Sequence, residues 1–209
     1  MKKYFMIFAL GMMALSTAAF AATTAVNTNT VSPTLQISAT IQKAVQLTLS
    51  TGTAAVTHCA VTPTGGTPDY TMNFGTVDAL GINTGNCNKF NPAVPGTDNA
   101  IYWSDYNLTP VFTSHTAISG TNITAQVTTN FGVSNIFIVR DSANSSTVPA
   151  GAASFTAVST GTPDTIAGPG VTSGTALTRF IGVAVTPANG ATVGTGAQSA
   201  TVTFTLTVQ

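Results

Sequence analysis

The sequence has very little charge, because Asp, Glu, Lys and Arg together make up 6% of its 209 residues. Ordinary soluble domains carry roughly a quarter. Glutamate is absent, and only six residues are lysine or arginine. No basic stripe is therefore available to neutralise phosphates, which excludes a nucleic-acid-binding protein. Good helix formers are also scarce, so helical bundles, coiled coils and Rossmann-type enzymes are poor candidates.

The residues that are abundant favour strands and turns. Threonine accounts for 40 residues, glycine for 19 and proline for 10. β-Branched residues are enriched in strands, while glycine and proline are enriched in turns. Hydrophobic residues reach 44% and the formal net charge is zero, which argues against simple disorder. The composition predicts an all-β protein.

The first 21 residues have the pattern of a secretory signal peptide. Lys2 and Lys3 precede an apolar run at 5–15, and an A-x-A cleavage site follows at 19–21. The run is too short for a spanning helix, so we expect cleavage after Ala21 and no membrane span in the mature chain. The alternative is an uncleaved anchor. The predicted localisation is secreted or extracellular at the bacterial surface, reached through the periplasm.

Two cysteines, Cys59 and Cys87, are the only ones in the chain. An oxidising compartment favours a disulfide between them. Together with the neighbouring His58 they supply too few ligands for an obvious metal site, and no C-x-x-C spacing indicates a redox enzyme. We predict a structural disulfide.

Apolar and polar residues alternate along most of the mature chain, which is the pattern of half-buried strands. The expected strands are 35–49, 54–60, 70–77, 101–106, 108–114, 123–129, 135–140, 154–158, 177–186 and 202–208, with loops at 63–68, 91–99 and 161–174. Many short strands with turn residues between them predict one antiparallel sandwich or barrel domain.

The first expected strand is too long for one compact domain. The apolar residues Leu35, Ile37, Ala39, Ile41, Val45, Leu47 and Leu49 keep one register, which only Lys43 interrupts. This stretch would span about 50 Å, whereas ordinary strands span about 17–20 Å. The strand either bends near Lys43 and Ala44 within a monomer, or its first part leaves the domain. A departing part would bury its apolar face in another copy by strand addition.

Three features resemble the secreted pilins of the spore coat U and archaic chaperone–usher type. Cys59-Ala60-Val61 follows the leading strand, and the stretch MNFGTVD at 72–78 is similar to the family's aliphatic-x-Phe-Gly-Thr segment. A Thr/Val/Phe strand also runs to the last residue. Residues 83–99, residues 160–175 and the position of Cys87 depart from the family pattern.

The resemblance implies an immunoglobulin-like antiparallel β-sandwich that is completed by a strand from a neighbouring subunit. The expected division is a signal peptide at 1–21, an N-terminal extension with the donor strand at 22–43, and one sandwich domain at 44–209. The donor residues would be Leu35, Ile37, Ala39 and Ile41, with a hinge at Lys43 and Ala44. The implied function is a structural subunit of an extracellular filament. Its partners would be other copies, either with a periplasmic chaperone and an outer-membrane usher or by self-assembly.

Nothing in the sequence indicates catalysis or a cofactor. Ser114, His115 and Asp105 could be chosen as a triad, but residues this common coincide by chance, and the catalytic motifs with known spacing are absent. Tyr102, Trp103 and Tyr106 form one aromatic cluster in the sequence. Alternation places Tyr102 and Trp103 on opposite faces of a strand, so at most part of the cluster would be exposed, and we expect it to pack in the core. We expect no enzyme, cofactor or metal. The alternative function is a monomeric or tip-located adhesin that binds glycan or a surface.

Overall fold

The computed structural model describes residues 35–40, 43–55, 57–113, 120–187 and 196–208. It divides the chain into two units, Met1–Thr40 and Ile41–Gln209. In the first unit, residues 35–40 form no strand and are exposed. The predicted signal peptide, residues 22–34 of the predicted extension and the predicted donor residue Ile41 lie outside the described residues. The elements below all belong to the second unit.

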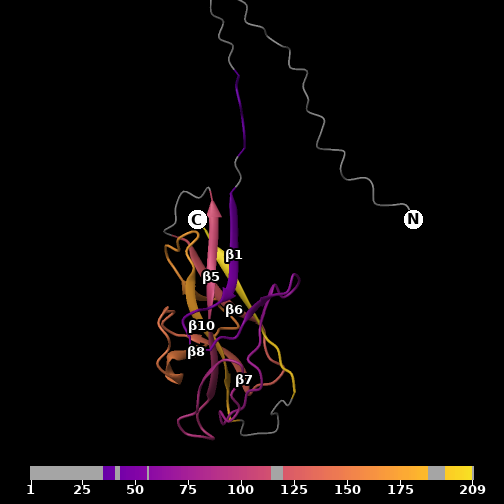
Figure 1. The fold of residues 1–209 in the computed structure, drawn as a ribbon, viewed down its shortest axis with the longest axis vertical. Helices are drawn as coiled ribbons and strands as arrows, with labels where there is room; N and C mark the ends of the chain where they lie inside the picture. The colour runs from indigo at the N-terminus through magenta and orange to yellow at the C-terminus, as the bar shows by residue number, and fades with distance from the viewer. Residues whose placement is uncertain (1–34, 41–42, 56, 114–119, 188–195, 209) are drawn as a thin grey trace, which may run out of the picture. The chain divides into compact units, whose positions relative to one another are not determined.

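The second unit is built from antiparallel sheets, as the sequence predicts, and its described residues contain no α-helix. The largest sheet has the order β1 (Ala44–Thr51), β5 (Ala100–Thr113), β10 (Leu177–Val185), β7 (Ile136–Asp141), β8 (Phe155–Ala157), with β4 (Asn88–Phe90) also paired to β5 (Figure 1). The second sheet has the order β11 (Thr201–Thr207), β6 (Asn122–Thr129), β9 (Asp164–Ala167). β2 (Val61–Pro63) pairs with β3 (Tyr70–Met72), and one 3₁₀ turn, η1 (Ala152–Ser154), precedes β8.

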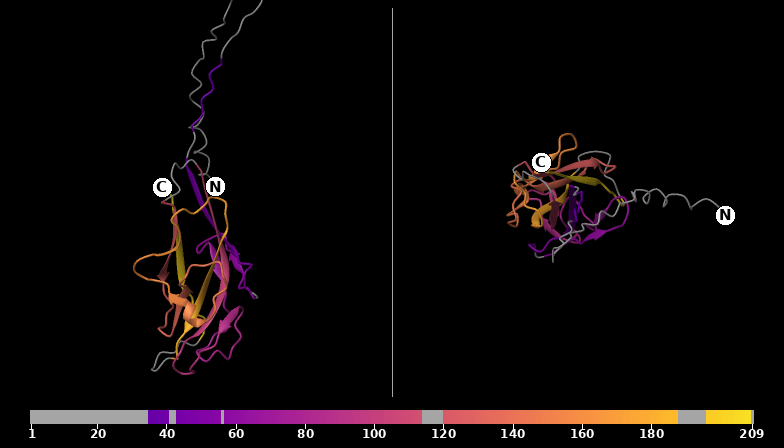
Figure 2. Two further views of the ribbon diagram at one scale, coloured as in Figure 1. Left: turned by 90° about the vertical axis from the view of Figure 1, so that its left-hand side faces the viewer. Right: turned by 90° about the horizontal axis from the view of Figure 1, so that it is seen from above.

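The two larger sheets enclose one hydrophobic core (Figure 2). Alternate residues of β5, such as Tyr102 and Leu108, point into this core and meet Ile123 of β6 and Ile166 of β9. All four are at most 2% exposed. Fully burying such a side chain contributes about 1.5–3 kcal/mol, so this interface stabilises the domain.

The opposite face of the six-stranded sheet is also covered. Ile101 and Trp103 of β5 pack there with Phe180 and Ala184 of β10. Tyr102 and Trp103 therefore lie in different clusters on opposite faces of one strand, as the alternation predicts. Both are buried, which confirms core packing for this pair.

Several predicted strand boundaries are wrong. The described residues 54, 55 and 57–60 form no strand, the strand predicted at 70–77 ends at Met72, and the strands predicted at 101–106 and 108–114 are the single strand β5, with residue 114 outside the described residues. Three short strands, β2, β4 and β9, were not predicted. The overlong first strand is reduced to β1, which begins at Ala44.

Candidate functional site

The predicted disulfide between Cys59 and Cys87 is present, with the two Cα atoms 5.2 Å apart. Cys59 lies two residues before β2, which starts at Val61, and Cys87 directly precedes β4. The amide of Cys59 donates a hydrogen bond of 2.9 Å to the hydroxyl of Ser104 in β5. The disulfide thus ties the segment before β2 and the start of β4 to the centre of the largest sheet.

A second anchor beside the disulfide is the buried carboxylate of Asp105. One of its oxygens accepts hydrogen bonds from the amides of Ala54 at 2.5 Å and Ala55 at 3.1 Å, and the other lies 2.6 Å from Nδ1 of His58. The side chain of Asp105 is 0% exposed. A buried carboxylate is tolerated only where such donors surround it. These contacts hold Ala54, Ala55 and His58 against β5.

Asp105 also explains why the described residues between β1 and β2 form no strand. β1 pairs with β5 from Tyr106 onward, and β4 pairs with residues 101–103. Between these two pairings, the side chains of Ser104 and Asp105 accept hydrogen bonds from the amides of Ala54, Ala55 and Cys59, in place of a strand ladder. Asp105 pairs with His58 in this arrangement. Ser114 and His115, the other members of the triad considered from the sequence, lie outside the described residues.

Among the described strands, two edges on one side of the two-sheet domain have no partner strand. β1 ends the order of the larger sheet and β11 ends the order of the smaller sheet, and the two strands are in contact. β1 starts, and β11 ends, at the same end of the domain (Figures 1 and 2). Neither strand contains a charged residue. Charged residues on an edge strand usually prevent it from pairing with another chain. Neither of these two edges has this protection.

The apolar residues on this side are incompletely covered. Leu47 and Leu49 of β1 pack on the common core, as do Val202, Phe204 and Leu206 of β11, and all five remain partly exposed. Val45, at the start of β1, is 57% exposed. In a finished two-sheet core these positions would be buried. The core is therefore open along β1 and β11.

A groove with a volume of about 150 Å³ lies on this side. Val202 and Phe204 of β11 form one wall, and Val61 and Met72 of the β2–β3 hairpin form another. Tyr106 of β5 also lines the groove, and its ring centroid is 5.5 Å from that of Phe204. Burial raises the pKa of Tyr106 above its usual 10.0. The groove suits apolar side chains.

The predicted donor residues are exposed where the structure describes them. Leu35 and Ile37 are each 84% exposed, and Ala39 is exposed as well. At the predicted hinge, Lys43 is exposed and Ala44 is the first residue of β1. The alternation of apolar residues in the sequence points to these donor residues. It does not reveal the β2–β3 hairpin as a wall of the groove, because three-residue strands leave no clear periodic signal.

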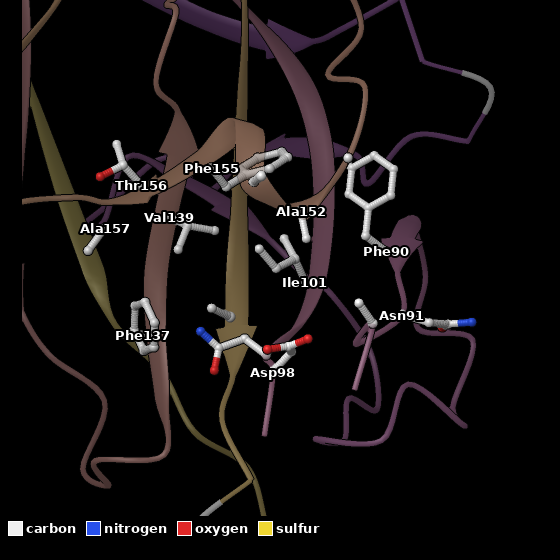
Figure 3. Close-up of a pocket in the computed structure, with 15 residues that line it drawn as sticks. Phe90, Asn91, Asp98, Ile101, Phe137, Val139, Ala152, Phe155, Thr156 and Ala157 are labelled. Carbon is white, nitrogen blue, oxygen red and sulfur yellow. The ribbon is translucent and has the colours of Figure 1, made fainter. Parts of the chain in front are cut away.

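A larger pocket, of about 840 Å³, lies on the outer face of the six-stranded sheet. Figure 3 shows Phe155 and Asp98 at opposite ends of this pocket with Ile101 between them, while Phe90 and Phe137 stand on opposite sides. Phe90 stacks on Trp103 with ring centroids 5.4 Å apart. No sequence pattern predicts this pocket, because its lining comes from β4, β5, β7, β8 and β10, which are far apart along the chain.

The loop after β3 is braced by Asp78. Its carboxylate accepts hydrogen bonds from the amides of Leu80 at 2.8 Å, Ile82 at 3.1 Å and Asn83 at 2.6 Å, and from the hydroxyl of Tyr102 at 3.2 Å. Burial raises the pKa of Asp78, but the hydrogen bonds lower it by more. Its pKa therefore lies below the ordinary 3.8.

Comparisons with known proteins return no match to a family model, to a curated protein or to a solved structure. Within the described ranges, no three His, Cys, Asp or Glu side chains gather into a group that could hold a metal ion. The described part of the chain also contains no helix with the length and hydrophobicity needed to cross a membrane.

Proposed function

We propose that this protein is a pilin-like structural subunit of an extracellular bacterial filament. In this proposal the two-sheet domain is an immunoglobulin-like sandwich, and the segment 22–43 of one copy supplies a strand to the next. The observation that carries the proposal is the open apolar side along β1 and β11, where core residues stay partly exposed beside uncharged, unpaired edges. A strand from another copy would cover these residues and satisfy the edges.

The spacing of the donor residues matches the groove. Leu35, Ile37, Ala39 and Ile41 recur every second residue, and Val202, Phe204 and Leu206 of β11 recur at the same interval. Side chains two apart in a strand point to the same face, about 6.6 Å from one another. A donor strand laid along β11 would therefore place its apolar side chains over the open core.

A stable junction between copies requires several donor side chains to be buried together. Leu35 and Ile37 are each 84% exposed, and fully burying each contributes about 1.5–3 kcal/mol. Association itself costs at least about 4 kcal/mol. Two anchors alone barely exceed this cost. The remaining donor residues and the main-chain hydrogen bonds of strand addition are therefore needed for a stable filament.

The sequence between donor strand and domain favours exchange between copies over insertion into the same copy. Only Gln42 and Lys43 separate Ile41 from Ala44, the first residue of β1. A two-residue reversal beside β1 would require a tight hairpin turn, which is built from Gly, Asn or Asp. Gln42-Lys43 contains none of these. An extended connection into a neighbouring copy makes no such demand.

Deletion of residues 22–42 tests the proposal. The truncated protein is expected to form no filaments, because it has a groove and no donor. A synthetic peptide with the sequence of residues 34–43 should then raise its midpoint of thermal unfolding, whereas the same peptide with Ile37→Asp should not. Filaments of the truncated protein in electron micrographs would refute donation by this segment.

A further inference from the structure

The pocket and the groove for the donor strand lie on opposite faces of the six-stranded sheet. Ile101, Val139 and Ala184 of β5, β7 and β10 line the pocket and belong to the outer cluster, whereas Tyr106, Ile138 and Ile181 of the same strands line the groove and face the common core. Its volume of about 840 Å³ falls within the roughly 300–1,000 Å³ of typical ligand sites. It also has their composition, with an apolar lining and a few polar groups.

The apolar part of the lining consists of a flat floor and aromatic walls. Ile101, Val139 and Ala184 come from three neighbouring strands and form the floor. Phe90 and Phe155 form a wall, with ring centroids 6.3 Å apart, and both rings pack against Trp103 behind them. Because Trp103 backs both rings, the wall is rigid. Such a surface requires a ligand with an apolar face.

The polar part of the lining accepts hydrogen bonds at one end. Among the described residues that line the pocket, Asp98 is the only charged one, and Asn99 follows it in the chain. One carboxylate oxygen of Asp98 accepts the amide of Val94 at 2.8 Å, and the structure gives the other oxygen no hydrogen-bond donor among the described residues. No lysine or arginine lines the pocket, so a phosphate, sulfate or carboxylate ligand would meet repulsion without compensation.

We propose that this pocket binds a short neutral oligosaccharide. The C–H face of a sugar ring packs on phenylalanine rings, whose faces carry partial negative charge. Hydroxyl groups farther along the oligosaccharide donate hydrogen bonds to Asp98 at the other end of the pocket. A purely apolar ligand would leave this carboxylate desolvated and unpaired. The neutral sugar therefore satisfies both ends of the pocket, and this binding does not depend on filament formation.

Saturation-transfer NMR of the full chain with lactose, maltose and cellobiose tests the proposal, and sialyllactose and choline serve as controls. We expect saturation transfer to at least one neutral disaccharide and none to sialyllactose. Asp98→Asn should weaken binding about tenfold or more, because a hydrogen bond to a charged acceptor is lost. Asp69→Asn, which changes an exposed carboxylate outside the pocket, should leave binding unchanged.

A second variant, Phe155→Leu, keeps the wall apolar but removes the ring and should also reduce binding. Its thermal unfolding midpoint, measured in parallel, shows whether the domain is folded. Three results would overturn the proposal: no transfer to any of the three neutral disaccharides, unchanged affinity in folded Asp98→Asn, or binding of choline in place of sugar. The last would assign the pocket to a cation held by aromatic rings and a carboxylate.

Discussion

Replacing Ile37 with aspartate should abolish filament assembly, while the same replacement at Ser38 should not. Ile37 is 84% exposed in the single chain, and it is the second apolar residue of the proposed donor strand. Its burial would contribute about 1.5–3 kcal/mol to each junction. Aspartate forfeits this contribution and adds a desolvated carboxylate, which costs several kcal/mol more. The total loss is about 4 kcal/mol or more, which weakens each junction by about a thousandfold.

Ser38 provides the matched control. It neighbours Ile37, so in a strand its side chain points to the opposite face, and Ser38→Asp adds the same charge to the same segment. We expect a change within about 0.5 kcal/mol per junction. The assay is the critical concentration for assembly, measured by sedimentation and checked by electron microscopy. An unchanged critical concentration for Ile37→Asp, or an equal rise for both variants, would refute the reasoning.

Three further predictions concern the stability of the domain. Replacing Cys59 and Cys87 with alanine should lower the free energy of unfolding, measured by urea denaturation, by about 3–4 kcal/mol. A loss below about 1 kcal/mol would contradict a stabilising role of the disulfide. Asp105→Asn should cost about 2–4 kcal/mol because it removes a buried acceptor, whereas the exposed Asp69→Asn should be nearly neutral in the same assay. The folded pKa of Asp78 is depressed below 3.8, so its contribution to the free energy of unfolding is present above pH 3.8 and is lost as the pH falls through the folded value. Asp78→Asn should therefore lose less stability on acidification than the wild type. An equal loss of stability in both proteins between neutral and acid pH would contradict this assignment.

The alternation of apolar residues predicted the parts of the fold that one core organises. The strands predicted at 123–129 and 177–186 agree closely with β6 and β10. β6 packs alternate residues against the common core, and β10 forms a continuous apolar run because both of its faces are covered. The opposite faces of Tyr102 and Trp103 follow from the same rule. The disulfide was predictable because only one pairing exists for two cysteines.

The failures arise where long-range contacts override local pattern. The sequence 54–60 predicts a strand, yet the amides of Ala54, Ala55 and Cys59 bond to the side chains of Asp105 and Ser104, which are distant in sequence. β9 lies within a stretch rich in Gly and Pro that predicts a loop, but Ile166 and Ala167 complete the core and hold it in the smaller sheet. The outer pocket combines residues from five strands, so no single stretch of sequence signals it.

Cross-linking between two differently marked copies tests the central claim most directly. One protein carries Ile37→Cys, and the other carries one added cysteine in place of Val202, Phe204 or Leu206 of β11; both keep the native disulfide. After the two are mixed and assembled, we expect a disulfide-linked pair of chains on a non-reducing gel from at least one combination, and none when Ser38→Cys replaces Ile37→Cys. Filaments that form without any such cross-link would contradict the account, as would cross-links found only within a single chain that carries both cysteines.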